Sequence, residues 1–311
     1  MKKLSVCIPC YNEVDNITAI CKNVEKVLID KLTQYDYEIV IIDNGSTDGT
    51  RKEIKLLTDC NKKVKAILNT RNFGPVCSPV YGMMACSGDC VIQMAADFQD
   101  PPELIPVLVK QWENGYKIVI AKKDKSDEKK IMYFIRSMYY SFMKNIADIE
   151  HIEHFTGFGL YDHSFVDILN QYDDPIPYLR GIVCETGLKR TEICFHQPQR
   201  KKGKTKTNFY SLYDFAMLGI TSYSKILLRL ATMLGFVLSA LSLIISLVYL
   251  GYKIIYWNDF AVGTAPVLIG LFAFSSVQLF FIGLLGEYIL NINTRIMHRP
   301  LVIEEKRINF D

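Results

Sequence analysis

The chain has 311 residues, a formal net charge of +3 and 50% hydrophobic residues, and its mean hydropathy of +0.12 is high for a water-soluble enzyme of this length. No nucleic-acid-binding surface is indicated, because the one basic tract is short and lies next to apolar segments. The nine cysteines are an odd number without paired metal-ligand spacing, which favours reduced thiols over disulfides. Cys7 and Cys10 form a Cys-x-x-Cys, but their place at a strand end does not favour a redox site.

Strand and helix patterns alternate along the first 121 residues. Short apolar runs predict strands at 4–9, 37–42, 64–68, 91–94 and 117–121. Helical spacing of apolar residues predicts helices at 16–28 and around 79–86, and the turn that starts at Asp43 offers N-cap residues to another helix. This order predicts an α/β fold with a doubly wound, mostly parallel sheet, which binds its ligands at the carboxyl ends of the strands.

Residues 122–225 contain a charged segment, a helical pattern and an apolar, aromatic segment. Residues 122–130 are almost all charged and predict a mainly solvated loop, and 131–146 return to helical spacing. Residues 209–220 are apolar and aromatic, which predicts an amphipathic helix at the membrane interface over 209–225. Residues 1–208 are then one domain, and they should stay in the cytoplasm because the N-terminal apolar run is too short for a secretory signal.

Two uncharged runs, 230–252 and 260–286, each exceed the roughly 20 residues that cross a bilayer as a helix. They predict a transmembrane hairpin over 226–290, with spans at about 230–252 and 262–286, and a cytoplasmic tail at 291–311. Basic residues flank its outer ends, whereas the connecting loop carries only Lys253 and Asp259. The positive-inside rule therefore places both termini in the cytoplasm and the chain in the inner membrane of a bacterium as a multi-pass protein.

Polar motifs follow three predicted strands and should meet at one edge of the sheet. They are residues 9–13 (Pro-Cys-Tyr-Asn-Glu), 43–50 (Asp-Asn-Gly-Ser-Thr-Asp-Gly-Thr) and 97–103 (Asp-Phe-Gln-Asp-Pro-Pro-Glu), joined by 71–74 (Arg-Asn-Phe-Gly). Asp97 and Gln99 supply a carboxylate and an amide oxygen that can share a divalent cation. Taken alone, the segment around Asp97 is typical of a turn more often than of a metal site, and its position at a strand end is what favours the metal site.

In their order and spacing, these motifs resemble those of the family 2 glycosyltransferases with a GT-A fold. With the hairpin, the chain is most similar to membrane-anchored polyprenyl-phosphate glycosyltransferases, such as bactoprenol glucosyltransferases and dolichol-phosphate mannose synthases. The resemblance runs from Leu4 to Gly286-Glu287-Tyr288-Ile289 and His298-Arg299-Pro300-Leu301. It implies an inverting transfer of a single sugar from a nucleotide-sugar, a UDP-hexose or UDP-N-acetylhexosamine, to undecaprenyl phosphate at the cytoplasmic leaflet. It does not identify the sugar, the downstream glycan or the flippase. It also leaves the oligomeric state open, and a homo-oligomer is compatible with it.

The resemblance also implies roles for individual residues. The nucleotide pocket would be lined by Pro9, Tyr11, Asn12, Glu13, Asp43 and Arg71. Asp43 would accept a hydrogen bond from the base or ribose, and Arg71 would pack against the base. An Asx turn before Gly45 is a compatible alternative for Asp43, and a surface ion pair is an alternative for Arg71.

Asp97 and Gln99 would hold Mg²⁺ or Mn²⁺ against the donor diphosphate. The common family pattern is Asp-x-Asp, and Ala95 stands where its first Asp is expected. If that Asp normally acts through water or ribose, the metal site survives with lower affinity. If it is a direct ligand, Ala95 marks an inactive protein or an engineered mutant.

Cations would position the acceptor phosphate and close over the diphosphate. The candidates for the acceptor phosphate are Lys122, Lys123, Arg136 and Arg180, and the implied catalytic set is Asp97, Arg136, Arg200 and Lys206. The last two belong to a tract that resembles the family's Arg-x-x-Gly-x-Ser/Thr-Lys loop, while Lys201, Lys202 and Lys204 suit anionic lipid.

Many relatives carry an Asp, a suspected base, where Gly157 stands. The acceptor can dispense with a base, because a lipid monophosphate is substantially dianionic near neutral pH. His151, His154 and His196 are interpreted as structural or surface groups.

Two other functions stay open. A catalytically silent family member that binds nucleotide or lipid and scaffolds a membrane partner would explain Ala95 and Gly157. A processive polysaccharide synthase is less favoured, because two spans offer little material for a polymer channel and no Gln-x-x-Arg-Trp signature is evident.

Overall fold

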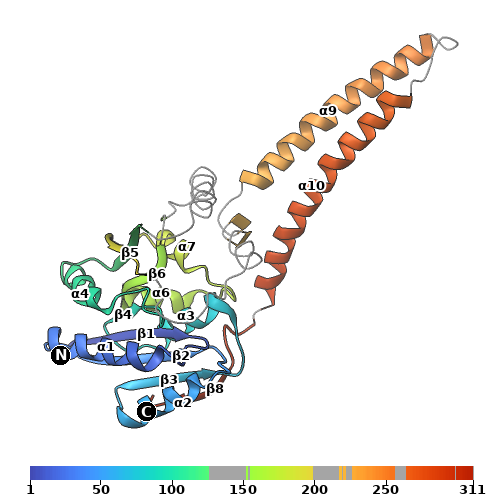
Figure 1. Ribbon diagram of the computed structural model, residues 1–311. Helices are drawn as coiled ribbons and strands as arrows, with labels where there is room; N and C mark the ends of the chain where they lie inside the picture. Colours follow the sequence, from blue (N-terminus) through green and yellow to red (C-terminus); the bar gives the residue numbers. More distant parts are fainter. Residues whose placement is uncertain are drawn as a thin grey trace.

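The computed structural model describes residues 1–125, 152, 155–198, 217–218, 220–221, 226–255, 264–297 and 299–310. An α/β domain carries both chain ends, and two long helices extend away from it side by side (Figure 1). The strands are β1 (Lys3–Cys10), β2 (Asp36–Asp43), β3 (Val64–Asn69), β4 (Cys90–Gln93), β5 (Ile118–Lys125), β6 (Phe155–Asp162), β7 (Arg190–His196) and β8 (Glu304–Ile308). The helices are α1 (Ile17–Lys31), α2 (Thr50–Cys60), α3 (Gly74–Met84), α4 (Ile105–Glu113), α6 (His163–Gln171), α7 (Leu179–Glu185), α9 (Ile226–Ile255) and α10 (Thr264–Ile296).

The eight strands form one mixed sheet in the order β7-β5-β6-β4-β1-β2-β3-β8. Its centre is parallel, as predicted, because β1 pairs with β2 and β4, and β2 pairs with β3. β6 runs antiparallel to both β4 and β5, and β8 runs antiparallel to β3. β5 and β7 pair in parallel, so four of the seven pairings between the described strands are parallel and the sheet is mixed with a parallel majority. The strand–helix alternation that predicted parallel pairing ends at β5, and it says nothing about strands that follow longer connections.

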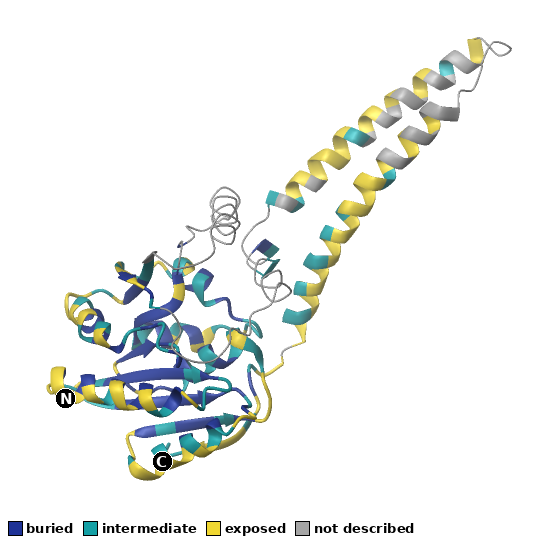
Figure 2. Ribbon diagram, viewed as in Figure 1, coloured by how far each residue is buried: buried dark blue, intermediate teal, exposed yellow. Residues whose placement is uncertain are grey.

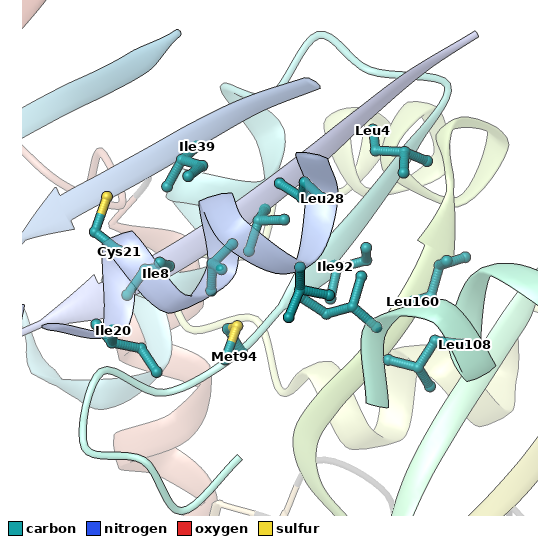
Figure 3. Packing of buried hydrophobic residues seen from close by; sticks show 14 of the residues in the cluster. Leu4, Ile8, Ile20, Cys21, Leu28, Ile39, Ile92, Met94, Leu108 and Leu160 are labelled. Atoms are coloured by element: carbon teal, nitrogen blue, oxygen red, sulfur yellow. The ribbon is translucent and has the colours of Figure 1, made fainter. Parts of the chain in front are cut away.

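Helices cover both faces of the sheet, because successive strand residues point to opposite sides. Leu4 and Ile8 of β1 face a cluster that includes Cys21 and Leu28 of α1, and Cys7 faces a second cluster built with α3 and α6. Figure 3 shows the first cluster, in which α1 lies over β1 and β2. Burying a side chain of this size contributes about 1.5–3 kcal/mol, so the two clusters fix the sheet that carries the loops.

The predicted strands and the helices between them are confirmed as far as β5, with small shifts. α3 begins at Gly74, earlier than the predicted helix around 79–86. The predicted loop at 122–130 is wrong for its first residues, because β5 continues to Lys125 and pairs with β7 there. The predicted helix at 131–146 lies outside the described residues, as does the interfacial helix at 209–225 apart from the helical residues 217–218 and 220–221.

Where their side chains are described, helices α9 and α10 expose most of their large apolar residues (Figure 2). In the part of the chain that the structure describes, one stretch, Phe274–Ile296, is long and apolar enough to cross a membrane. It ends ten residues beyond the predicted span of 262–286, because the helix continues through Glu287 and Arg295 to Ile296. The predicted first span, 230–252, lies within α9.

The tail after α10 is part of the domain. Residues 304–308 form the edge strand β8, which pairs with β3 from Ala66 to Asn69. Four of its five residues are charged, which suits an exposed edge but hides a strand from any search for apolar alternation.

The cysteines are all unpaired, as the sequence indicated. Burial raises the pKa of the Cys10 thiol well above its ordinary value. A thiol that resists ionisation is a poor nucleophile, which argues against a redox role for Cys10.

Glu38 on β2 joins three strands at the amino end of the sheet. Its carboxylate is 1% exposed and accepts hydrogen bonds from Ser5 Oγ (2.6 Å), Lys3 Nζ (2.8 Å) and Ser87 N (2.7 Å), with Lys65 Nζ also at 2.8 Å. Burial alone would raise its pKa, but these donors outweigh burial and lower the pKa from 4.5 to about 2. The stability that Glu38 contributes is therefore present above about pH 4.5 and is lost as the pH falls towards 2.

We expect Glu38→Gln to lower the free energy of unfolding by about 3 kcal/mol near neutral pH, because it leaves buried donors facing a neutral amide. The measurement is denaturant-induced unfolding of the detergent-solubilised protein. The difference in free energy of unfolding between Glu38→Gln and the unaltered chain should shrink as the pH falls from about 4.5 to 2. Asp36→Asn removes an exposed pair with Lys63 and should cost under about 1 kcal/mol. A Glu38→Gln penalty that is the same at every pH would contradict this account.

Candidate active site

The carboxyl ends of β1 and β2 carry loops that are held together by hydrogen bonds. Asn12 N donates to Ser46 Oγ (2.8 Å), and Thr47 N donates to Asn12 Oδ1 (2.7 Å). Glu13 N donates to Thr50 Oγ1 (2.9 Å). The motifs at 9–13 and 43–50 are thus one structural unit, in which the predicted pocket residues Asn12 and Glu13 contact the loop that follows Asp43.

Asp43 lies at the end of β2 and is fully buried. Its carboxylate accepts hydrogen bonds from Ser46 N (3.2 Å) and from Arg51 Nε (2.8 Å). The bond from Ser46 is the local turn that the sequence left open for this residue. In this conformation Asp43 shapes the loop from within, and its contact with a base or ribose stays a prediction.

Asn44 joins this unit to the loop at 71–74. Its Nδ2 donates to Asn72 Oδ1 (2.9 Å) and Gly74 O (3.0 Å), and its Oδ1 accepts from Phe73 N (2.9 Å). No sequence pattern indicated this role, because an Asn in a Gly-Ser-Thr turn is ordinary turn composition.

Gly45 makes the close contact between the same two loops sterically feasible. It has a φ of +78°, and a Cβ added there would lie 2.5 Å from the carbonyl carbon of Arg71. Arg71 itself is exposed, and its guanidinium lies 4.0 Å from the centroid of the Phe73 ring. Within the described residues its contacts are this ring and Asn72 O rather than a carboxylate, so the arginine is available to a ligand.

The Asp97 motif folds into a tight bend directly after β4. Gln99 N donates to Asp97 Oδ1 (3.1 Å), and Phe98 sits at a positive φ of 63°. Asp100 is 5% exposed and accepts from Ala95 N (2.8 Å), which closes the bend. Burial, with a smaller contribution from Asp97, raises the pKa of Asp100 to about 6. Sequence reasoning missed Asp100 as the residue that shapes this loop.

The residues present fit a hard divalent cation. In the described part of the chain, no group of three His, Cys, Asp or Glu residues that could hold a metal is found. Asp97 and Gln99 offer oxygen ligands, and Ala95 offers none. Mg²⁺ is commonly held by one or two protein carboxylates together with substrate phosphates and water, so this incomplete set suits an ion that arrives with a diphosphate.

Gly157 on β6 lies beside a buried amide. It has a φ of +103°, and a Cβ added there would lie 3.7 Å from Gln93 Nε2. Gln93 is 9% exposed, and its Oε1 has no hydrogen-bond partner among the residues that the structure describes. A neutral amide thus lies next to Gly157, the position at which the resemblance implied an Asp in other family members. Sequence reasoning missed Gln93, although a glutamine at the end of a buried strand is itself a signal.

The predicted cations have different surroundings, and some of them lie outside the described residues. Lys122 pairs with Glu192 on β7 (3.2 Å), whereas Lys123 is near enough to Asp100 to oppose the rise in its pKa. Arg180 lies half-buried on α7. The remaining candidates, Arg136, Arg200 and Lys206, lie outside the described residues, as do His151 and His154, and His196 is exposed at the end of β7.

A mixed sheet with polar loops at the carboxyl ends of parallel strands, one of them an acidic bend, has the features expected of a GT-A-like fold. The chain belongs to glycosyl transferase family 2, whose model matches residues 5–168, and it is a glycosyltransferase. An uncharacterized glycosyltransferase of Synechocystis is 33% identical over 97% of this chain and 94% of its own length. The prophage-derived bactoprenol glucosyl transferase of Shigella flexneri is 30% identical over 98% of each chain.

A solved structure supports the fold. The glucosyl-3-phosphoglycerate synthase of Mycobacterium tuberculosis, in complex with phosphoglyceric acid, superposes with a TM-score of 0.50 at 16% identity. The match covers 71% of this chain and 78% of that one. The resemblance to GT-A glycosyltransferases that the motifs indicated is thus confirmed by family, relatives and fold.

Proposed function

We propose that this enzyme transfers a single sugar, with inversion, from a nucleotide-sugar to a polyprenyl phosphate at the cytoplasmic face of a bacterial inner membrane. The observation that carries the proposal is the alignment with a bactoprenol glucosyl transferase over 98% of both chains. That match includes the long helices as well as the catalytic domain. Undecaprenyl phosphate is the proposed acceptor, and a UDP-hexose or UDP-N-acetylhexosamine is the proposed donor.

The donor would lie across the loops at the ends of β1 and β2. Tyr11, Asn12 and Glu13 follow β1 directly, and the loop at 71–74 is held beside them through Asn44. An exposed guanidinium next to Phe73 suits the flat face of a base. Asp97 and Gln99 would hold Mg²⁺ or Mn²⁺, and the bound ion would neutralise charge that develops on the leaving diphosphate.

The acceptor phosphate needs positive groups rather than a base. As a dianion it is already nucleophilic, so the neutral pair of Gly157 and Gln93 is compatible with transfer. The described cations proposed to position it are Lys122, which also pairs with Glu192, Lys123 and Arg180. Arg136, Arg200 and Lys206 are proposed from the sequence. Each would have to act at short range, because exposed charges are screened within about 10 Å at ordinary ionic strength.

Helices α9 and α10 are proposed to form the membrane hairpin. Their exposed side chains are those of a lipid-facing surface, among them Phe236, Leu241, Leu271 and Phe280. The two helices lie side by side in Figure 1, and α10 leads back to the domain. Both ends of the hairpin would then be on the side of the membrane where the donor is found.

The test is sugar transfer to undecaprenyl phosphate from a panel of labelled nucleotide-sugars, with Mn²⁺ and membranes, for the unaltered chain and for Ala95→Asp. We expect the unaltered chain to transfer one sugar. Ala95→Asp should lower the Mn²⁺ concentration for half-maximal rate on the order of ten-fold, because cation affinity rises with ligand charge. Failure of both proteins to form a glycosylated lipid with every donor would contradict the proposal.

One alternative has an observation in its favour. Ala95 and Gly157 replace two carboxylates of the family pattern, which suits a silent member that binds nucleotide or lipid for a partner. That protein would bind nucleotide without metal dependence and would not turn over even as Ala95→Asp. Formation of an elongated polymer would instead indicate a processive synthase.

A further inference from the structure

The chain that leaves α10 returns to the sheet beside the donor loops. β8 pairs with β3, and Ile303 O, just before it, accepts from both Thr70 N (3.0 Å) and Thr70 Oγ1 (3.2 Å). Past the strand, Asn309 Nδ2 donates to Thr58 O (2.8 Å) and Val64 O (2.9 Å). These bonds fix the tail at both ends of β3, and one end lies directly before the loop at 71–74.

Arg51, at the start of α2, connects this tail to the donor loops. Its Nε donates to Asp43 Oδ2 (2.8 Å) and its Nη1 donates to Glu305 Oε2 (2.7 Å). Its Nη2 donates to Asn69 O at the end of β3. One guanidinium therefore contacts the ends of β2, β3 and the tail at once, which its planar fork allows and a lysine ammonium would not.

The burial of the three groups shows what each contributes. The Asp43 side chain is 0% exposed, so its charge needs the arginine. The Arg51 side chain is 29% exposed and that of Glu305 is 54% exposed. Glu305 thus accepts from Nη1 of Arg51, whereas Nε and Nη2 of the same guanidinium donate to Asp43 and to Asn69 O. An exposed pair of this kind adds little to stability, and its main effect is on orientation.

We propose that Arg51 and Glu305 are positioning residues for the nucleotide donor, through which the tail that follows the membrane helices sets the shape of the donor pocket. This inference rests on the proposed function. Glu305 acts through Arg51, which aligns Asp43 with the Thr70 end of the loop at 71–74. Loss of the Glu305 carboxylate should weaken nucleotide binding. It should leave the rate of the chemical step and the binding of the lipid acceptor unaffected.

The experiment measures the affinity of the full-length protein, in detergent with Mn²⁺, for UDP, GDP, CDP and dTDP, together with donor and acceptor kinetics. For the nucleotide that binds, Glu305→Gln should raise Kd and the donor KM about five-fold, the most that an oriented surface pair supplies. Arg51→Lys should raise them about ten-fold or more, because an ammonium cannot reach three acceptors. The turnover number and the acceptor KM should stay within a factor of two.

Two further variants separate positioning from mere strand docking. Glu305→Asp keeps the charge and should restore most of the affinity. Lys306→Gln alters an exposed neighbour on β8 and should change nothing. If Glu305→Gln has the nucleotide affinity of the unaltered chain, with or without a lower melting temperature, the inference is wrong but the proposed function still stands. Failure of the unaltered chain to bind any of the four nucleotides would overturn the proposed function and the inference together.

Discussion

Asp97→Asn is expected to lower the rate of sugar transfer about a thousand-fold at saturating substrates, equivalent to about 4 kcal/mol of transition-state stabilisation. The change is isosteric, and the amide can still accept from Gln99 N, so the bend should keep its shape. What would be lost is the carboxylate proposed to hold the cation; in the same bend, Ala95 contributes none and Asp100 is turned towards Ala95 N.

The measurement is the initial rate of lipid glycosylation over a Mn²⁺ series. Glu103→Gln, an exposed change in the same motif, is the matched control and should retain the rate of the unaltered chain. A loss under ten-fold for Asp97→Asn would show that Asp97 is not the metal ligand. A loss that high Mn²⁺ fully restores would indicate weakened binding of the ion rather than a missing charge at the transition state.

Gly45→Ala is expected to raise the donor KM about a hundred-fold, because two penalties act at one place. A side chain at φ +78° is strained, and its Cβ would lie 2.5 Å from the backbone of Arg71. Strain of this kind costs on the order of 1 kcal/mol, and overpacking against backbone adds about 1–3 kcal/mol. The loop at 71–74 must move away, and Arg71 moves with it.

Gly115→Ala separates the two penalties. Gly115 has a φ of +88°, close to that of Gly45, but a Cβ there meets nothing within 4 Å. It follows α4, away from the donor loops. We expect Gly115→Ala to lower the melting temperature slightly and to leave the donor KM unchanged. Equal effects of the two variants on the donor KM would mean that contact between the loops is irrelevant to binding.

The elements that could be predicted from the sequence are those whose own residues determine them. Leu4 to Ile8 alternate between two buried faces, and the apolar spacing from Ile17 to Leu28 can only be a helix packed on one side. The positions of the donor loops follow from that order, because parallel strands end at a common edge. Residues 11–13 and 43–50 therefore meet as expected.

What could not be predicted depends on partners distant in the sequence. Asn44 becomes important through the loop at 71–74, and Arg51 through a carboxylate at position 305. Asp100 looks like part of a Pro-rich turn until its bond to Ala95 N is seen. The strand β8 has no apolar pattern because its face towards solvent dominates its composition. In each case the missing information is a tertiary contact.

The position of β8 in the chain has a consequence for how the enzyme is made. The strand that completes the sheet beside β3 is synthesised after α9 and α10. During synthesis the catalytic domain therefore carries β3 as an unpaired edge while the long helices are still being delivered. Open edges invite pairing with other chains. Nascent chains released before residue 304 should consequently aggregate more readily than the finished protein, even though they contain every loop of the site.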